Sequence, residues 1–361
     1  MSRPLNLINA SGGAERPRTA DRAIAIWLLG CAAMIFAMVV VGGITRLTES
    51  GLSITEWRPL SGAVPPMSEA EWARLFDQYR QIPEYRADHP EMTIVSFKTI
   101  FWWEYVHRLW GRLIGVAFAL PFLYFILRGR IARPLVPRLA AMLALGAAQG
   151  GLGWYLVKSG LADRIDVSQY RLVAHLMLAL AIYASMLWTA LDLLRPAAPP
   201  VPRRRSVPWR GHLLVVAGLV VMTIVFGGFV AGLDAGRIYN TFPLMGGRVM
   251  PADALAFEPA WINPFENPSM AQFIHRILAI VTVCAALWLW ARVRSSRNRD
   301  LPSGTIAAID LLALIAMAQA SLGIATLVLV VPIPLAAAHQ AGAVALLSLV
   351  IWPLHATRGA G

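Results

Sequence analysis

Apolar residues form eight long runs along the chain, separated by polar segments. A helix needs about 20 consecutive apolar residues to span the hydrocarbon core of a bilayer, and each run is close to that length. The runs lie at residues 24–43, 105–127, 136–157, 171–194, 211–231, 271–291, 305–330 and 335–354. The pattern predicts an all-α integral membrane protein with eight transmembrane helices.

The polar segments between these runs define the expected domain boundaries. Residues 1–23 are predicted to be a disordered cytoplasmic tail, and residues 355–361 a second, short tail. The helices at 24–194 and at 211–354 are predicted to form two four-helix bundles, joined by a Pro- and Arg-rich cytoplasmic linker at 195–210. This division follows from an internal repeat.

The two halves of the chain carry the same motifs in the same order. Segment 39–66 matches 224–251: in each, a helix ends in Gly-Gly and is followed by a glycine-containing loop, an aromatic residue, Pro-Leu and a final Pro. EYVHRLWGRLIG at 104–115 matches QFIHRILAI at 272–280 in the same way. Four helices are an even number, so the second unit enters the membrane in the same direction as the first. The repeats are therefore predicted to be parallel, unlike the inverted repeats of many transporters.

The first loop of the first bundle, residues 44–103, is much longer than a helical hairpin requires. Within it, residues 68–79 have apolar side chains at helical spacing and a capping box formed by Ser68 and Glu71, which together predict a short amphipathic helix. This helix could lie on the membrane surface or over the bundle, or it could pack on other loop segments. A lid over a site is a third interpretation.

Composition and charge agree with a membrane protein. The 361 residues are 57% hydrophobic and only 14% charged, with a mean hydropathy of +0.58. The net charge of +12 is unevenly distributed: with the N-terminus inside, the cytoplasmic segments carry 18 basic and five acidic residues, and the other side carries 14 and 15. This distribution follows the positive-inside rule, so both termini are predicted to be cytoplasmic and the basic charge does not indicate nucleic-acid binding.

Four of the seven histidines occupy equivalent places in the two halves. His107 and His175 in the first half, and His275 and His339 in the second, each lie a few residues into a helix that starts at the outer face. A polar side chain inside a membrane bundle is costly and usually has a partner or a function. Two histidines that face the core of a four-helix bundle are suited to holding a cofactor.

Haem fits this pattern better than zinc does. Haem iron takes one or two axial ligands in a large apolar slot, whereas zinc needs a third or fourth ligand, and none lies one helical turn away. Arg108 and Arg276 directly follow two of the histidines, where a guanidinium could reach a haem propionate or a lipid headgroup. The sequence predicts two bis-histidine haem sites, with hydrogen-bonded packing histidines as the alternative.

One position beside these histidines differs between the halves. Glu104 lies three residues before His107, and Gln272 lies three residues before His275. Residues three apart share a helix face, so one site has a carboxyl group beside its ligand and the other has an amide. A carboxyl group can deliver protons and an amide cannot, which favours the first half for chemistry and the second for electron delivery. Alternatively, Glu104 is an exposed residue at a helix start, where its charge favours the helix dipole.

The combination of these motifs resembles the haem A synthases, in the branch shared by mitochondria and their bacterial relatives. The resemblance is carried by the two late histidines and by GGITRLTESGLSITEWRPLSGAVPP, PEYRADHPEMTIVSFKTIFWWEYVHRLWGR and AGLDAGRIYNTFPLMGGRVMP. It extends from about residue 24 to residue 354. Some relatives carry a cysteine pair in the first external loop, and residues 44–103 contain none, so a mechanism that needs this pair is not expected here.

The resemblance implies an enzyme that oxidises the C8 methyl group of haem O to the formyl group of haem A, for assembly of terminal oxidases. Two successive hydroxylations would give a geminal diol, which loses water. The resemblance also implies that His107 and His175 bind the substrate haem, that His275 and His339 bind a haem b, and that Glu104 is the functional carboxylate.

Two other functions are compatible with the residues alone. A di-haem b electron-transfer protein linked to quinol would need both histidine pairs, but it would not need the difference between Glu104 and Gln272. A transporter would need polar residues near the bilayer midplane, where few occur. These few are Asp310, Gln149 and Gln319.

The expected location and partners follow from the topology and the resemblance. The protein is expected in the bacterial inner membrane, with the histidine sites toward the periplasm. Its expected partners are haem O, an electron donor, haem O synthase and membrane lipid. Small-residue faces such as that of Gly146 and Gly150 could pack between helices or against a second copy of the chain.

Overall fold

The computed structural model describes residues 18–58, 61–162, 166–194, 203–295 and 301–358. Throughout this part of the chain the regular secondary structure is helical, and eight of its helices are long and apolar enough to cross a membrane. These are α1 (Arg18–Leu47), α4 (Ile94–Leu127), α5 (Val136–Ala162), α6 (Gln169–Leu194), α7 (Arg203–Gly232), α9 (Pro268–Ser295), α10 (Ser303–Val328) and α11 (Ile333–Ala356). The prediction of an all-helical membrane protein with eight spans is confirmed.

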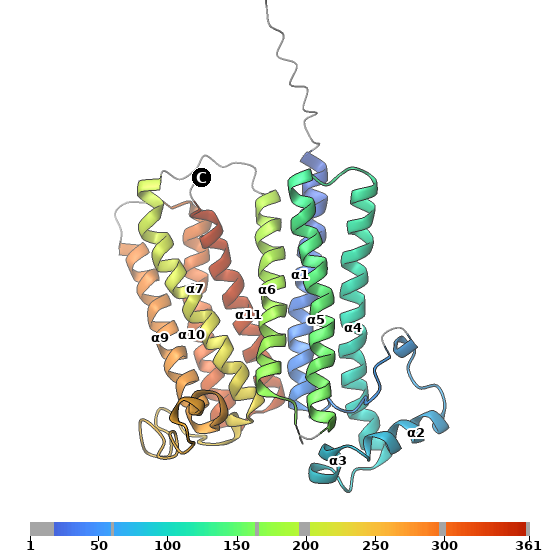
Figure 1. Cartoon of the computed structure of the whole chain (residues 1–361). Coiled ribbons are helices and arrows are strands. Elements are labelled where there is room, and N and C mark those ends of the chain that lie inside the picture. Colours follow the sequence, from blue (N-terminus) through green and yellow to red (C-terminus); the bar gives the residue numbers. More distant parts are fainter. Residues whose placement is uncertain (1–17, 59–60, 163–165, 195–202, 296–300, 359–361) are drawn as a thin grey trace, which may run out of the picture.

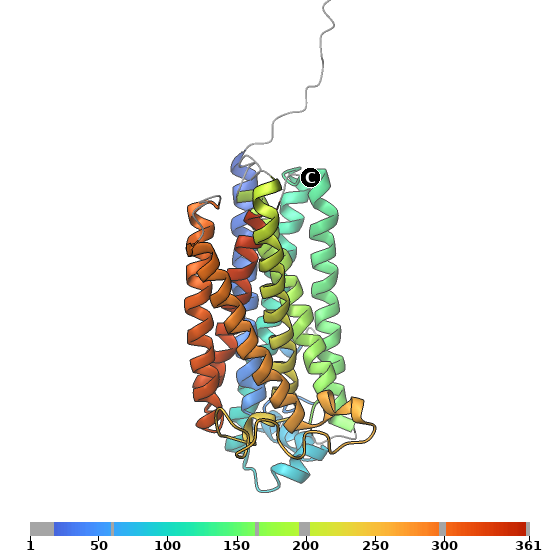
Figure 2. The same cartoon turned by 90° about the vertical axis from the view of Figure 1, so that its left-hand side faces the viewer.

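The eight helices stand side by side in two groups of four (Figures 1 and 2). In the first group, α1 and α5 each contact both α4 and α6, which closes a ring. In the second group, α7 and α10 each contact both α9 and α11, so the order of contacts is the same. The two rings meet where α1 and α6 pack against α11 and where α6 packs against α7.

The two ends of the bundle differ. The start of α1 and the end of α11 lie at the same end, which we call the terminal end (Figure 1). The opposite end, the loop end, carries α2 (Glu69–Tyr79) and α3 (Pro83–Asp88) from the first long loop, and α8 (Asn263–Glu266) from the loop between α7 and α9. Which end faces the cytoplasm follows from the charge distribution and stays a prediction.

Apolar side chains fill the half of the bundle nearest the terminal end. One continuous cluster of buried residues includes Leu28 of α1, Leu139 of α5, Leu213 of α7 and Val350 of α11. This cluster joins the two rings, which therefore share one apolar core. The histidines lie beyond it toward the loop end. α6, α9 and α11 start at that end and carry their histidine near the start, whereas α4 starts farther out, at Ile94, and reaches His107 after several turns.

The predicted amphipathic helix of the first loop is present as α2. The Ser68 hydroxyl caps it by accepting a hydrogen bond from the backbone N–H of Glu71 at 3.2 Å. Trp72 and Tyr79 are buried in an aromatic cluster with Phe97, which lies in the first turn of α4. The helix therefore packs against the part of α4 that extends toward the loop end.

The predicted tail and linker are shorter than expected. α1 begins at Arg18, so residues 18–23 are helical, and residues 1–17 of the predicted tail lie outside the described residues. α7 begins at Arg203, and residues 195–202 of the predicted linker also lie outside the described residues. In both places the helix continues past the apolar run.

The start of α4 also differs, and this changes the interpretation of Glu104. The helix begins at Ile94, where the Thr93 hydroxyl caps it by accepting a hydrogen bond from the Ser96 N–H at 3.3 Å. Glu104 therefore lies well inside the helix, and only 3% of its surface is exposed. The alternative that Glu104 is an exposed residue at a helix start is wrong.

Candidate functional site

The first histidine of each half lies against a glycine of the neighbouring helix. A Cβ atom added to Gly42 of α1 would lie 2.9 Å from Cε1 of His107 on α4. A Cβ atom added to Gly227 of α7 would lie 3.1 Å from Cε1 of His275 on α9. Both distances are shorter than an ordinary van der Waals contact, so each imidazole packs directly on the glycine backbone.

The second histidine of each half has the same kind of neighbour. An added Cβ atom at Gly153 of α5 would lie 3.1 Å from Cε1 of His175 on α6. At Gly323 of α10 it would lie 2.8 Å from Cε1 of His339 on α11. All four imidazoles are thus positioned by one repeated contact, and a residue with a side chain at any of the four glycines would require the imidazole ring to shift.

The two imidazoles of the second half are spaced as ligands of one metal ion would be. The ring centroids of His275 and His339 lie 6.5 Å apart, with the rings at 90° to each other. Imidazole–metal bonds of about 2.0 Å on both sides of an iron would give a ring separation of roughly 6 Å. Nδ1 of His275 donates to the backbone carbonyl oxygen of Thr223 at 3.0 Å, which leaves the lone pair on Nε2 free for a metal.

A haem suits this pair better than a bare metal ion. Among the described residues no group of three or more His, Cys, Asp or Glu side chains could hold a metal ion. Haem iron needs only two protein ligands. In addition, Nδ1 of His339 is buried and has no hydrogen-bond partner within the described part of the chain.

The first half combines the same elements. His107 and His175 lie within electrostatic range of each other, and Nδ1 of His107 is buried with no hydrogen-bond partner in the described ranges. The amide of Gln149 donates to the backbone carbonyl oxygen of His175 at 3.0 Å. Gln319 donates to the carbonyl oxygen of His339 at 2.7 Å, so this contact is also repeated in the second half.

The glycines and glutamines beside the histidines are residues whose role sequence reasoning missed. The sequence indicates the Gly-Gly pairs at the ends of the first and fifth apolar runs only as part of the internal repeat, and Gln149 and Gln319 only as polar residues near the bilayer midplane. The sequence does contain a pattern that could have revealed them: Gln149 and Gly153 are four residues apart in the first half, as are Gln319 and Gly323 in the second. Residues four apart lie on one helix face, so both members of each pair can reach the same histidine.

The carboxyl group of Glu104 is surrounded by hydrogen-bond donors. Oε2 accepts bonds from the hydroxyl of Ser53 at 2.7 Å and from the backbone N–H of Ile54 at 2.6 Å. Oε1 accepts two bonds from the guanidinium of Arg108, at 2.9 and 2.5 Å. Every bond that Glu104 makes with the described residues is one that it accepts, which suits a carboxylate.

Gln272 has different surroundings in the second half. Its Nε2 donates to the backbone carbonyl oxygens of Ala235 at 2.5 Å and Ile238 at 2.7 Å. Its Oε1 accepts a bond from Arg276 at 2.7 Å. This environment offers acceptors to one end of the side chain and a donor to the other, which suits an amide.

Arg108 and Arg276 hold the loops that follow α1 and α7. Arg108 donates to the carbonyl oxygens of Ile54 at 2.8 Å and Glu56 at 3.2 Å. Arg276 donates to the carbonyl oxygens of Tyr239 at 2.6 Å and Thr241 at 2.8 Å. In the repeat, Ile54 corresponds to Tyr239 and Glu56 to Thr241, so the two arginines make equivalent contacts. Binding of a propionate by either arginine stays a prediction.

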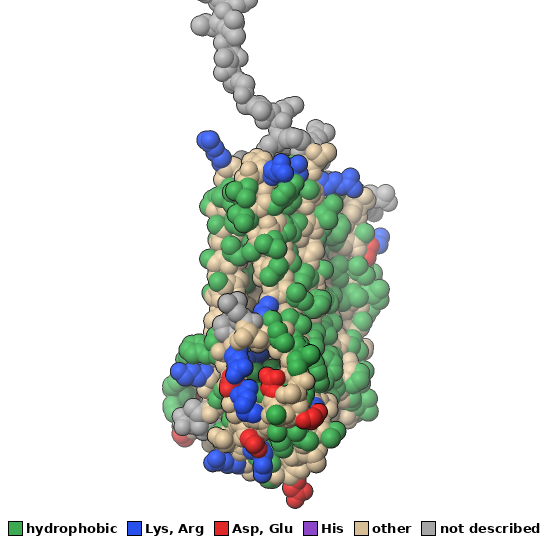
Figure 3. Space-filling view, turned by 90° about the vertical axis from the view of Figure 1, so that its right-hand side faces the viewer, with side chains coloured by type: hydrophobic (Ala, Val, Ile, Leu, Met, Phe, Trp, Pro, Cys, Tyr) green, Lys and Arg blue, Asp and Glu red, His purple; other side chains and the backbone are tan. Residues whose placement is uncertain are grey.

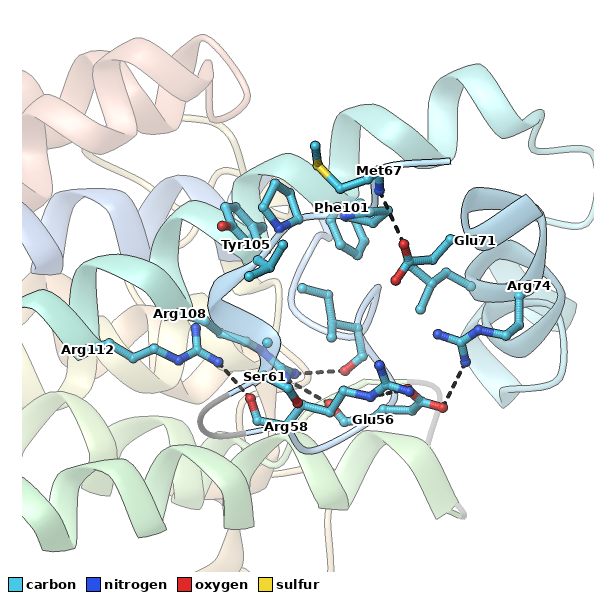
Figure 4. A pocket seen from close by; sticks show the side chains of 16 residues that line it. Glu56, Arg58, Ser61, Met67, Glu71, Arg74, Phe101, Tyr105, Arg108 and Arg112 are labelled. Atoms are coloured by element: carbon cyan, nitrogen blue, oxygen red, sulfur yellow. Dashed lines mark hydrogen bonds and ion pairs between the residues drawn. The ribbon is translucent and has the colours of Figure 1, made fainter. Parts of the chain in front are cut away.

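A cavity of about 150 Å³ lies on the loop side of Arg108 (Figure 4). Its charged lining residues are Arg58, Arg74, Arg108, Arg112, Glu56 and Glu71. Glu56 accepts bonds from Gln78 at 2.7 Å and Arg74 at 3.0 Å, and these bonds lower its pKa. Charged side chains also gather over this loop region on the molecular surface, whereas the long helices present mainly hydrophobic side chains (Figure 3). The excess of arginines suits an anionic group.

The fold and the paired histidines define an all-helical, multi-pass membrane protein with two equivalent candidate cofactor sites. The chain belongs to the COX15-CtaA family of cytochrome oxidase assembly proteins, whose family model matches residues 25–351. This confirms the family that the sequence motifs resemble.

Individual relatives match over nearly the whole chain. Heme A synthase of Rhodospirillum centenum is 49% identical over 355 residues, which cover 97% of this chain and 92% of the relative. Heme A synthase of Paramagnetospirillum magneticum is 49% identical over 359 residues, 98% of each chain. Heme A synthase COX15 of Bos taurus is 46% identical over 348 residues, which cover 94% of this chain and 83% of the bovine protein.

Proposed function

We propose that this protein acts as a haem A synthase, an oxidoreductase that converts the C8 methyl group of haem O to the formyl group of haem A. The near-full-length identity to relatives named Heme A synthase supports this activity. The observation that carries the proposal is the pair of equivalent histidine sites that differ in one buried group, Glu104 in the first half and Gln272 in the second. A protein that only relayed electrons would have no use for this difference.

In this proposal the two sites have different tasks. The first half binds the substrate haem O through His107 and His175, and the second half holds a haem b through His275 and His339. When bound, the haem b would supply an electron-transfer group that can pass electrons to or from the first site. The protein contributes the position of each imidazole, which the opposing glycine fixes, and the orientation of the His275 ring, which the Thr223 carbonyl sets.

Glu104 handles protons beside the substrate in this proposal. It lies one helical turn from His107, on the same face of α4, and bonds from Ser53, Ile54 and Arg108 hold its carboxyl group in one place. Oxidation of a methyl group to a formyl group moves protons as well as electrons, so a fixed carboxylate at this position can exchange them. The arginine-lined cavity beside Arg108 could receive the propionates of the substrate.

The topology and the partners are part of the same proposal. The protein spans the bacterial inner membrane as two parallel four-helix repeats, with both termini in the cytoplasm and the histidine sites toward the periplasm. The excess of basic residues in the segments at the terminal end supports this orientation. An electron donor, haem O synthase and a second copy of the chain are the partners to be sought.

A pigment analysis tests the proposed activity. The protein would be produced in cells that make haem O and have no haem A synthase of their own, and the extracted haems would be separated and identified. Haem A should appear with the wild-type chain and be missing with His107→Ala. If haem O stays unconverted while the protein is present in the membrane, the proposal fails. Quinol oxidation without haem A would favour the alternative, a di-haem electron-transfer protein.

A further inference from the structure

The loop between α1 and α4 buries two polar side chains that the proposed function does not use. Tyr79, the last residue of α2, has 0% of its surface exposed, and Glu84 of α3 has 6% exposed. Neither the Tyr79 hydroxyl nor Oε2 of Glu84 has a hydrogen-bond partner among the residues that the structure describes. Buried polar groups almost always have partners, so this pair points to water or to a transferred proton.

Acidic groups from several elements lie within electrostatic range of Glu84. Asp88 lies on α3 itself, Glu49 follows the end of α1, and Asp166 precedes α6. Glu104 of α4 is also within electrostatic range, both of Glu84 and of the Tyr79 hydroxyl. The carboxyl group of Glu84 in the covering loop and that of Glu104 beside the first histidine site are therefore near enough for the charge of one to affect the other.

Positive groups balance the outer acids of this cluster. Arg46 is 2.6 Å from a carboxylate oxygen of Asp166 and 2.6 Å from one of Asp234. Glu49 is 3.4 Å from His89 and 3.2 Å from Arg237. Asp166, Asp234 and Glu49 thus each have a partner of opposite charge, whereas the described ion pairs include neither Glu84 nor Asp88.

Glu84 is suited to carrying a proton near neutral pH. Burial, together with the nearby acids Asp166, Glu104 and Glu49, raises its pKa to about 8. Burial also raises the pKa of Tyr79, so its hydroxyl keeps its proton and can both donate and accept a hydrogen bond. In the second half, the hydrogen-bond partners of Gln272 are two backbone carbonyls and Arg276, and an amide cannot exchange protons in this way.

We propose that Glu84, with the Tyr79 hydroxyl beside it, exchanges protons between Glu104 and the water at the loop end of the bundle. A proton that Glu104 takes up leaves the Glu84 carboxyl group, and water then reprotonates Glu84. A proton that Glu104 releases follows the reverse route. The inference rests on the proposed function, in which Glu104 exchanges protons with the substrate site. Glu84 affects the substrate site only through Glu104.

Infrared spectroscopy of the full-length protein tests the relay without using its activity. The carboxylic-acid C=O band of Glu84 should decrease as the pH is raised through about 8, because the group then loses its proton. The band should be missing in Glu84→Gln and retained in Glu69→Gln. Glu69 is a matched control, since it lies on α2 and pairs with Lys98 at the surface. A spectrum of Glu84→Gln identical to that of the wild type would overturn the inference.

The pH dependence of haem A formation gives the second measurement. We expect Glu84→Gln to lower the rate about tenfold at unchanged haem content and to remove the change in rate near pH 8, while Glu84→Asp restores part of it. Tyr79→Phe should slow the reaction, and Tyr85→Phe should not, because the Tyr85 hydroxyl donates to the Pro90 carbonyl oxygen. Wild-type kinetics in Glu84→Gln overturn the relay alone. Absence of haem A from the wild type overturns the proposed function and the relay with it.

Discussion

Glu104 and Gln272 occupy equivalent positions in the two halves, yet hydrogen-bond donors surround the first and backbone acceptors lie against the second. A hydroxyl and a backbone N–H donate to Glu104, whereas two backbone carbonyls accept from Gln272. The loops of the two halves have therefore changed together with the side chain. An exchange of one residue on a fixed scaffold would have left the same backbone groups facing both, so the difference marks two environments adapted to two chemical groups.

The arginines beside these residues show how much of the scaffold has stayed the same. Arg108 and Arg276 donate to carbonyls at matching positions of the two loops. The four glycine–histidine contacts are likewise shared. Beside the first histidine of each half, the difference is therefore confined to a few polar atoms, and substitutions there should separate the two sites.

The largest effect is expected for Glu104→Gln. The amide would place N–H groups against Arg108 or against the Ile54 N–H, where only acceptors fit, and it could not carry a proton. Loss of a proton-transfer group typically lowers a rate by about 100-fold or more. We expect haem A formation to fall by at least about that factor while the haem content stays near that of the wild type, as measured by pigment extraction.

The reciprocal change, Gln272→Glu, is the matched control. It would place a carboxylate against the carbonyl oxygens of Ala235 and Ile238, so the second half should lose haem and stability. If Gln272→Glu were harmless, or if Glu104→Gln formed haem A at the wild-type rate, the two environments would not be specific for their groups.

A second prediction concerns the glycine contacts, which the halves share. In Gly227→Ala the new methyl group would lie 3.1 Å from Cε1 of His275 and displace the ring. We expect a several-fold loss of the bis-histidine spectrum of the second half, measured by optical absorption of the purified protein. Gly218→Ala on the same helix is the control, because a Cβ atom there meets nothing within 4 Å. Equal haem loss in both variants would contradict the role of the glycine.

The fold was largely predictable from the sequence, and the sites only in part. Apolar runs locate membrane helices because every backbone polar group in a bilayer must be bonded within its helix. The internal repeat located the four histidines and the difference at Glu104. The burial of Glu104 was not predictable from the apolar run, because α4 begins at Ile94, in polar and aromatic sequence before that run, and this part of the helix packs on α2. The loop contacts of Arg108 and Arg276 were missed for a similar reason, since backbone carbonyls leave no pattern in a sequence.

A third prediction uses the shared arginine contacts and an effect on stability. Lysine cannot span two carbonyls and the Gln272 oxygen, so Arg276→Lys should lower the free energy of unfolding by about 1–2 kcal/mol. Arg108→Lys should destabilise the protein less, because Tyr105 also holds its loop by donating to the Ala63 carbonyl at 2.6 Å. It should nevertheless reduce haem A formation more, since Glu104 loses the two hydrogen bonds from the guanidinium. Thermal unfolding and pigment extraction of both variants measure these two effects. If Arg108→Lys lost more stability than Arg276→Lys, the loops would be held in another way.

The smallest effect is expected at the contact between the two rings. A Cβ atom at Gly43 of α1 would lie 1.6 Å from the side-chain oxygen of Gln340 on α11, whereas at the equivalent Gly228 of α7 it would meet Val173 at 2.9 Å and Leu176 at 3.6 Å. Gln340→Leu makes the first contact resemble the second. Because the volumes are similar, the free energy of unfolding should change by less than about 1.5 kcal/mol.

The same variant decides whether this contact is only structural. Gln340 directly follows His339, and Gly43 directly follows Gly42, which holds the His107 ring. If the amide serves only to pack α11 on α1, haem A formation in Gln340→Leu should stay within about twofold of the wild type, as with a conservative change of similar volume. A larger loss at normal stability and haem content would mean that the Gln340 amide takes part in communication between the two histidine sites. The two groups of four helices would then differ in function where they touch as well as beside Glu104.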